Sequence, residues 1–244
     1  MKHSLLAAAA AASVLAMGVG GALAADLTYE PPPAPPPPFT WAGFYAGVHA
    51  GYAWGSEDDN QSNLFGPEPT PADSFDMDGF VGGVHAGYNW QANQFVFGVE
   101  GDVDYTNIKG SEGYAGYVPD FRNDYVEGTL QLKSEWQASA RLRAGYAVDN
   151  FLIYATGGIA FADGKLSSNG YAYNADANFS SSDSNTHVGW TIGAGAEYAF
   201  TPNWIGRAEL RYTDFGSKTY ELLEGPVDAS WTQTAVTVGL SYKF

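Results

Sequence analysis

Charged residues in this 244-residue chain recur at alternate positions, within short stretches that are otherwise apolar or small. Because successive side chains of a β-strand point to opposite faces, such charges share one face of their strand. Arginine and carboxylate groups form bidentate ion pairs, so facing strands of this kind predict an ion-pair network. A narrow conduit lined by the same charges is the alternative interpretation. The charged positions are Glu100, Asp102, Asp104, Arg141, Arg143, Glu197, Arg207, Glu209 and Arg211.

Two histidines occupy the same hexapeptide, Gly-Val-His-Ala-Gly-Tyr, which occurs around His49 and again around His85. Both belong to the polar face of neighbouring predicted strands, so they could be direct cross-strand neighbours. A pair of imidazoles can hold a metal or a haem iron. Two histidines alone form an incomplete metal site, however, and polar packing is the interpretation that we favour. We expect no metal and no cofactor, with haemin as the open alternative.

A hydrolytic site would need a nucleophile activated by a neighbouring base. The one candidate combines His187 with the serine-rich segment at residues 180–184. A serine-rich segment alone is a weak signal, and no other nucleophile–base pair stands out. We therefore expect no catalytic residues and no enzyme activity.

The element that positions these residues is clearest in the last fourteen residues, Trp231 to Phe244. Counting back from Phe244, every second position as far as Val236 is aromatic or aliphatic, and the intervening ones are small or polar. About ten alternating residues with an aromatic end suit a tilted strand that crosses a bilayer. The pattern recurs in eight segments, at 41–55, 80–91, 95–109, 132–148, 151–166, 186–201, 204–218 and 231–244. The sequence therefore predicts an all-β fold, namely a transmembrane eight-stranded antiparallel up-and-down β-barrel.

The connections alternate between tight turns at 91–94, 149–150 and 201–203 and longer polar loops at 56–79, 111–131, 169–185 and 219–230. Bacterial outer-membrane barrels have short periplasmic turns and longer loops outside the cell. The turn at Pro202 places Glu197 opposite Arg207, and either register open to the third and fourth segments places an acid opposite Arg141. Side chains just fill a barrel of eight strands, so we expect the paired charges to plug the lumen.

The formal net charge is −16, and most of it falls in the predicted loops. Nucleic acid binding requires the opposite sign, so we expect no nucleic acid partner. Clustered carboxylates can recruit divalent cations, which the phosphates of lipopolysaccharide share. Simple solvation of an acidic surface is the competing interpretation. The partners that we expect are the lipid and lipopolysaccharide of an outer membrane.

Aromatic residues on the apolar face fall into two belts, one near the predicted loops and one near the tight turns. Aromatic rings with a polar tip are most stable at a membrane–water boundary, so the belts predict the two edges of the bilayer. The girdle positions are Tyr52, Tyr88, Trp90, Tyr105, Tyr146, Tyr198, Tyr212, Tyr242 and Phe244.

The N-terminal part indicates export. Residues 1–24 predict a cleaved secretory signal peptide, with a charged head, an apolar run and a small-x-small cleavage site. Residues 25–40 form a Pro-rich periplasmic segment, which is either a stiff spacer or a docking site, and residues 41–244 form the barrel. The chain has no cysteine, which excludes disulfides and thiolate metal sites. The predicted location is the outer membrane of a Gram-negative cell.

A resemblance to a known family is carried by two stretches, Trp41-Ala-Gly-Phe-Tyr-Ala-Gly-Val-His-Ala-Gly-Tyr-Ala-Trp-Gly55 and Val-Gly-Leu-Ser-Tyr-Lys-Phe244. Both resemble the small porin-family outer-membrane proteins of alphaproteobacteria, which are OmpA-like in architecture. That family includes major surface proteins of the Brucella–rhizobial type and haemin-binding outer-membrane proteins. The terminal phenylalanine also resembles the signal that the barrel-assembly machinery recognises in a last strand.

The resemblance implies an eight-stranded barrel with a structural or adhesive role, and haemin binding in some members. We therefore expect a structural, surface-exposed barrel that supports outer-membrane integrity and surface interactions. A small-solute porin-like channel and a haemin-binding surface receptor are the alternative hypotheses.

Overall fold

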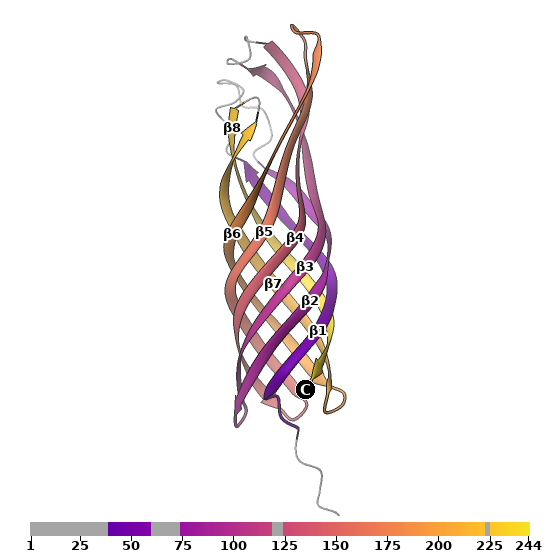
Figure 1. Cartoon of the computed structure of the whole chain (residues 1–244), viewed down its shortest axis with the longest axis vertical. Helices are drawn as coiled ribbons and strands as arrows, with labels where there is room; N and C mark the ends of the chain where they lie inside the picture. The colour runs from indigo at the N-terminus through magenta and orange to yellow at the C-terminus, as the bar shows by residue number, and fades with distance from the viewer. Residues whose placement is uncertain (1–38, 60–73, 119–123, 223–224) are drawn as a thin grey trace, which may run out of the picture. The chain divides into compact units, whose positions relative to one another are not determined.

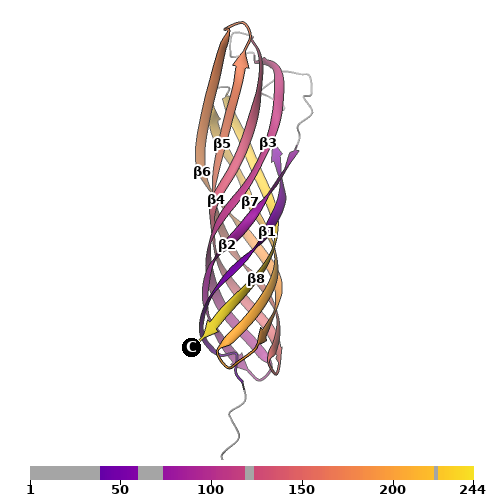
Figure 2. The same cartoon turned by 90° about the vertical axis from the view of Figure 1, so that its right-hand side faces the viewer.

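The computed structural model of the protein describes residues 39–59, 74–118, 124–222 and 225–244. These residues form a closed barrel of eight antiparallel strands, in which sequence neighbours pair and β1 closes the ring against β8 (Figure 1, Figure 2). The strands are β1 (Gly43–Asp59), β2 (Ser74–Ala92), β3 (Phe95–Val118), β4 (Asp124–Val148), β5 (Phe151–Ala172), β6 (Ala177–Ala199), β7 (Trp204–Leu222) and β8 (Gly225–Lys243). The predicted eight-stranded antiparallel barrel is confirmed.

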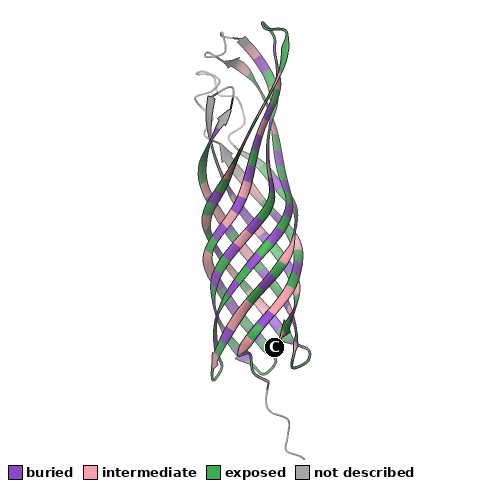
Figure 3. Ribbon diagram, in the orientation of Figure 1, coloured by how far each residue is buried: buried purple, intermediate pink, exposed green. Residues whose placement is uncertain are grey.

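Burial alternates along the strands, as a barrel with apolar surroundings and a filled interior requires. Large apolar side chains such as Phe44, Leu142 and Val238 are exposed on the outside. Figure 3 shows this alternation as successive buried and exposed positions along the ribbons. Such a surface suits lipid hydrocarbon, and the closed ring of paired strands leaves no sheet edge open to it. Among the described residues, no helix is long and apolar enough to cross a membrane.

The strands are longer than the apolar alternation predicts. Most of the predicted loops at 111–131 and 169–185 belongs to β3, β4, β5 and β6. The loops predicted at 56–79 and 219–230 also contribute their ends to strands, whereas residues 60–73 lie outside the described residues. Lipid contact demands apolar alternation only within the bilayer. Beyond it, polar strands stay paired through their backbone hydrogen bonds, which leave no such signal.

The tallest projecting part of the barrel is a four-stranded sheet built by β3 to β6, beside a shorter hairpin of β7 and β8. Pairing between β2 and β3 ends at Asp78 and Lys109, and pairing between β6 and β7 ends at Trp190 and Asp214. Beyond these points, β3 to β6 continue to pair among themselves in the described residues and form the tall hairpins of Figure 1. The protein therefore presents an extended strand surface beyond its lipid-facing band.

The opposite end of the barrel is closed by the predicted tight turns. β2 ends at Ala92 and β3 begins at Phe95, the turn before β5 also has two residues, and the turn before β7 has four. Asn93 and Asp149 adopt positive φ angles of 55° and 52° in these turns. Asparagine and aspartate tolerate the left-handed region better than most side chains, which explains their presence here. The C-terminus lies at this same end (Figure 1).

A β-bulge interrupts β4 where it leaves the apolar band. Its pairing with β5 shifts between Lys133 and Gln137. The carboxylate of Asp163 on β5 accepts hydrogen bonds from the backbone N–H groups of Glu135 and Trp136, both at 2.8 Å. Asp163 therefore satisfies the donors that the bulge removes from the ladder, and it fixes the positions of the residues on either side.

Folded protein should migrate differently from boiled protein on a denaturing gel, and it should stay in membranes that are washed with urea. The reason is that a closed barrel has no free strand edge within the bilayer at which unfolding can begin. The boiled sample serves as the unfolded reference. Release by urea as a soluble monomer would contradict the membrane-spanning barrel.

Candidate functional site in the barrel lumen

The lumen is filled by three successive layers of side chains. A charged layer lies in the middle, between two apolar clusters. The turn-side cluster consists of Trp41, Val96, Ala147, Leu152, Tyr154, Ala199 and Ile205, with Phe39 packed against it. The loop-side cluster consists of Ala53, Met77, Val81, Ile108, Leu130, Leu132, Ala160, Ala162, Leu166, Phe215, Tyr220, Trp231 and Ala235.

Glu100 on β3 is the centre of the charged layer. Its carboxylate lies 2.6 Å from Arg141 and 2.9 Å from Arg207, and 3.4 Å from Arg143. It also accepts a hydrogen bond of 2.7 Å from the hydroxyl of Tyr45. The register places Glu100 directly opposite Arg141, one of the pairings that the sequence predicts. A single carboxylate thus faces three guanidinium groups from two other strands.

Glu209 on β7 is the second centre. Its carboxylate lies 2.6 Å from Arg141, 2.8 Å from Arg207 and 3.2 Å from Arg211. The hydroxyl of Tyr154 donates a further hydrogen bond of 2.8 Å. Arg141 and Arg207 therefore bridge Glu100 and Glu209, which joins β3, β4 and β7 across the lumen.

The remaining predicted charges attach to these two centres. Asp102 lies 2.8 Å from Arg141 and 3.0 Å from Arg211. Glu197 stands opposite Arg207 in the register, as the turn at Pro202 predicts. Its nearer partner is nevertheless Arg143, at 2.9 Å against 3.8 Å for Arg207. The pairing in the lumen is therefore set across the barrel as well as between neighbouring strands.

Two inward tyrosines complete the network, and the sequence reading missed both. The guanidinium of Arg143 lies over the ring of Tyr154, 4.2 Å from its centroid, and 5.4 Å from the ring of Tyr45. A cation held over a buried aromatic face is stabilised by the ring quadrupole. Alternation along the strands could have identified them, because both tyrosines lie on the same strand face as the inward polar residues.

His49 lies at the edge of the charged layer, beside Asp104. Its Nε2 atom is 2.7 Å from Asp104, whose other oxygen lies 3.6 Å from Arg211. The layer holds five carboxylates and four guanidinium groups, and the imidazole stands beside the carboxylate with the weakest arginine contact. Among the described residues, no group of His, Asp and Glu side chains is arranged to hold a metal ion.

The two histidines could have been direct cross-strand neighbours by their pattern, but the structure does not pair them in this way. The register places His49 opposite Gly83 and His85 opposite Gly47, so the imidazoles meet on a diagonal. Their Nδ1 atoms lie 3.1 Å apart, and Nε2 of His85 lies 2.7 Å from the hydroxyl of Ser241. Each ring faces a glycine in the register, and a Cβ atom on Gly47 would lie only 2.7 Å from the ring of His85. The ring nitrogens are engaged with protein atoms, as polar packing requires.

His187 does not form the candidate catalytic pair with the serines at 180–184. Its side chain is fully buried in the lumen, with Nε2 2.6 Å from the hydroxyl of Tyr220. Its ring also packs 4.5 Å from the ring of Trp231, measured between centroids. The serines lie further along β6, in the projecting sheet, opposite residues 167–169 and 165 of β5. The imidazole of His187 therefore packs within the loop-side cluster and is not part of a nucleophile–base pair with these serines.

Trp41 closes the turn-side mouth of the lumen. The sequence analysis placed this residue in the first strand instead. β1 begins only at Gly43, and Trp41 folds into the barrel with an exposed fraction of 1%. Its backbone N–H donates to the side chain of Gln91 at 2.7 Å, and its indole N–H donates to the backbone oxygen of Asp149 at 3.2 Å. The turns thus anchor an aromatic side chain across the mouth.

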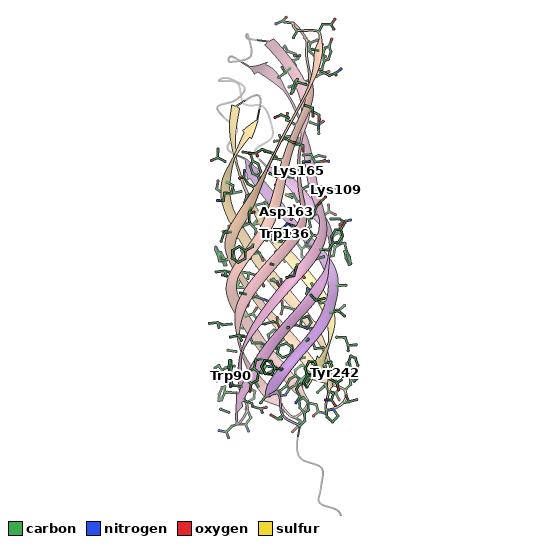
Figure 4. All side chains as sticks on the ribbon, in the orientation of Figure 1. Trp90, Lys109, Trp136, Asp163, Lys165 and Tyr242 are labelled. Atoms are coloured by element: carbon green, nitrogen blue, oxygen red, sulfur yellow. The ribbon has the colours of Figure 1, made fainter. Side chains whose placement is uncertain are left out.

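The predicted girdle residues point outward, and Tyr88 is half-buried. Figure 4 places Trp90 and Tyr242 near the end that carries the turns, and Trp136 towards the other end. Tyr105 and Phe244 are 65% and 74% exposed. The predicted signal peptide at 1–24 and all but the last two residues of the Pro-rich segment at 25–40 lie outside the described residues.

The chain is similar to known outer-membrane proteins. The family described as "Outer membrane protein beta-barrel domain" matches residues 4–244. The 31 kDa outer-membrane immunogenic protein of Brucella melitensis is 38% identical over 96% of this chain and 98% of its own length. The 25 kDa outer-membrane immunogenic protein of Brucella abortus is 34% identical over 91% of each chain. Among solved structures, Neisserial surface protein A is 18% identical, with a TM-score of 0.42 over 83% of this chain and 98% of its own.

Proposed function

The chain belongs to the family of outer membrane protein β-barrel domains, and from this premise we propose that it is a structural, surface-exposed barrel with a lumen closed to solutes. The observation that carries the proposal is the layered filling of the lumen. Solutes and ions cross an outer-membrane barrel only where it encloses a continuous path of water. Here a network of ion pairs is enclosed between two apolar clusters.

Each layer opposes conduction for a different reason. The apolar clusters exclude water, and a hydrophobic constriction blocks ions when it dewets. In the charged layer, the carboxylates are engaged with arginines, so they offer no line of free charge along which a cation could move. These three barriers in series favour a structural role over the porin-like alternative. The proposal includes no catalysis, since His187 is buried against Tyr220 and Trp231.

The same proposal includes the partners of the barrel. Lipid and lipopolysaccharide contact the outward apolar band and its girdles, and the barrel-assembly machinery recognises β8 during insertion. Surface interactions use the projecting sheet of β3 to β6, because it extends beyond the apolar band. At the tip of this sheet, a hydrogen bond to the Glu127 carboxylate raises the pKa of the Tyr173 hydroxyl. The exposed carboxylates of Glu127 and Asp176 near the same tip make this surface polar and acidic.

Refolded protein in planar lipid bilayers should show only rare, small conductance steps. A 16-stranded porin refolded by the same procedure is the positive control for insertion, because such barrels enclose an aqueous channel. The gel shift of the unboiled sample shows that the protein under test is folded. Large and long-lived openings of the unaltered protein would overturn the proposal, and the chain would then be a pore.

A further inference from the structure

Three lysines form a row on the outside of the barrel. The register places Lys109 on β3 opposite Lys133 on β4, and Lys133 opposite Lys165 on β5. Figure 4 shows Lys109 on β3 and Lys165 on β5 at a similar height on the barrel. The whole chain contains only 11 lysines and arginines, against 27 acidic residues. The described residues hold two more lysines outside this row: Lys218, which is exposed, and Lys243, which is half-buried at the turn-side end with its ammonium group over the ring of Phe39.

A row of like charges is costly, because the Cβ atoms of directly opposite residues lie only about 5 Å apart. Of the three lysines, Lys133 has a carboxylate partner, the exposed Glu135 at 2.6 Å. Within the described part of the chain, no carboxylate lies within 4.0 Å of the ammonium groups of Lys109 and Lys165. The ammonium groups of Lys109 and Lys165 therefore lie on either side of an ion pair, without a carboxylate of their own among the described residues.

The other carboxylates near the row are engaged elsewhere. Asp78 stands opposite Lys109 in the register, but it accepts a hydrogen bond from the hydroxyl of Tyr52. Asp163 lies two positions from Lys165, and its carboxylate holds the backbone of the β4 bulge. The acidic residues thus shape the surroundings of the row without pairing its two outer lysines.

The height of the row on the barrel indicates what the counter-charge is. Tyr105 on β3 stands opposite Trp136, which lies within the β4 bulge, and both are exposed on the lipid face. Aromatic residues of this kind mark the boundary between hydrocarbon and head groups. The lysines follow within four positions on each strand, at about 3.3 Å per residue along a tilted strand. Their ammonium groups therefore reach the layer of lipid head groups, where phosphates lie.

We propose that Lys109 and Lys165, held in register by Lys133 and the Asp163-bound bulge, bind the phosphate groups of a phosphorylated glycolipid in the outer leaflet. Ammonium groups are strong donors to phosphate oxygens, and charge-assisted hydrogen bonds of this kind are short and strong. The acyl chains of the same lipid would then lie on the apolar face below, beside Trp136. The inference rests on the membrane orientation in the proposed function, but not on the closed lumen.

The test titrates refolded protein in zwitterionic micelles with lipid A that carries phosphates, and follows its tryptophan fluorescence. The double variant Lys109→Gln with Lys165→Gln should bind this lipid with about tenfold lower affinity, because it loses charge-assisted hydrogen bonds. The matched control, Lys218→Gln with Lys243→Gln, makes the same change in net charge at other sites. It should bind as the unaltered protein does.

Dephosphorylated lipid A and inorganic phosphate identify the source of the phosphate. The proposal requires weak binding of dephosphorylated lipid and only weak competition by inorganic phosphate. Equal affinity for both lipids, or equal loss in both double variants, would overturn it. Strong competition by inorganic phosphate would likewise overturn the lipid assignment in favour of a free-anion site. The gel shift and bilayer conductance of the variants should not change, so a failure here is distinct from failure of the closed-barrel proposal.

Discussion

Replacing Glu100 with alanine should destabilise the refolded barrel by about 3–5 kcal/mol, since it breaks a buried ion-pair network from one side. The carboxylate of Glu100 faces Arg141, Arg143 and Arg207. It also accepts a hydrogen bond from the hydroxyl of Tyr45. Without it, three guanidinium groups remain in an enclosed layer with too few acceptors. The free energy of unfolding is measured by urea titration in lipid vesicles, with the gel shift reporting the folded fraction.

Two further variants separate the buried network from charge in general. Glu135→Ala removes a carboxylate from the exposed pair with Lys133, and its unfolding should be almost unchanged because solvent screens that pair. Adding Arg141→Leu to Glu100→Gln removes one of the guanidinium groups left without a partner. The free energy of unfolding of the double variant should therefore fall by less than the sum of the two single-variant losses. A Glu100→Ala protein as stable as the unaltered one would show that the lumen charges are not held by one another.

The barrel and its charged layer could be predicted because both depend on a local signal. Alternation along each strand assigns residues such as Arg141 and Arg143 to the inside, whatever their partners. Short turns then set the register, and the turn at Pro202 places Glu197 opposite Arg207. The pairing across the lumen could not be predicted in this way, since Glu197 lies closer to Arg143 than to Arg207. Cross-barrel distances depend on the tilt and shear of all strands together, which a local pattern does not contain.

The apolar layers were missed although part of their signal was present. Trp231 shares its parity with Gln233 and Ala235, so alternation alone assigns it to the inside. Glycine opposite an inward ring is a second signal, because the register places Tyr45 against Gly87. A Cβ atom on that glycine would lie 2.4 Å from the tyrosine hydroxyl. Phe215 could not be assigned in this way, since the irregular register of β7 after Asp214 breaks the alternation.

The projecting strands show a limit of a different kind. Residues 177–185 were predicted as part of a polar loop, but they belong to β6 and pair with β5 throughout. Sequence patterns report the solvent on each face of a strand, and above the bilayer both faces meet water. Backbone pairing alone then extends the strands, with no apolar period to mark it. The same loss of signal concealed the lysine row, whose three members become neighbours only through register.

Replacing Trp231 with alanine should cost about 3–5 kcal/mol, the usual range for removing a large aromatic side chain from a packed core. Its ring is 2% exposed and lies 4.5 Å from the ring of His187 and 4.8 Å from that of Phe215, measured between centroids. Trp190→Ala is the matched control, because Trp190 points to lipid near the same end of the barrel and is 47% exposed. It should lose much less stability in the same urea titration. Trp231→Phe should fall between the two.

The same Trp231→Ala variant tests whether the three layers act in series. Its cavity opens the loop-side cluster, but the charged layer and Trp41 at the opposite mouth stay in place. Conductance in planar bilayers should therefore stay at the level of the unaltered protein, even though the barrel is less stable. If each layer closes the lumen independently, the variant should lose stability without gaining conductance. Sustained openings in this variant would mean that the loop-side cluster alone closes the lumen, and that the ion pairs below it conduct once water reaches them.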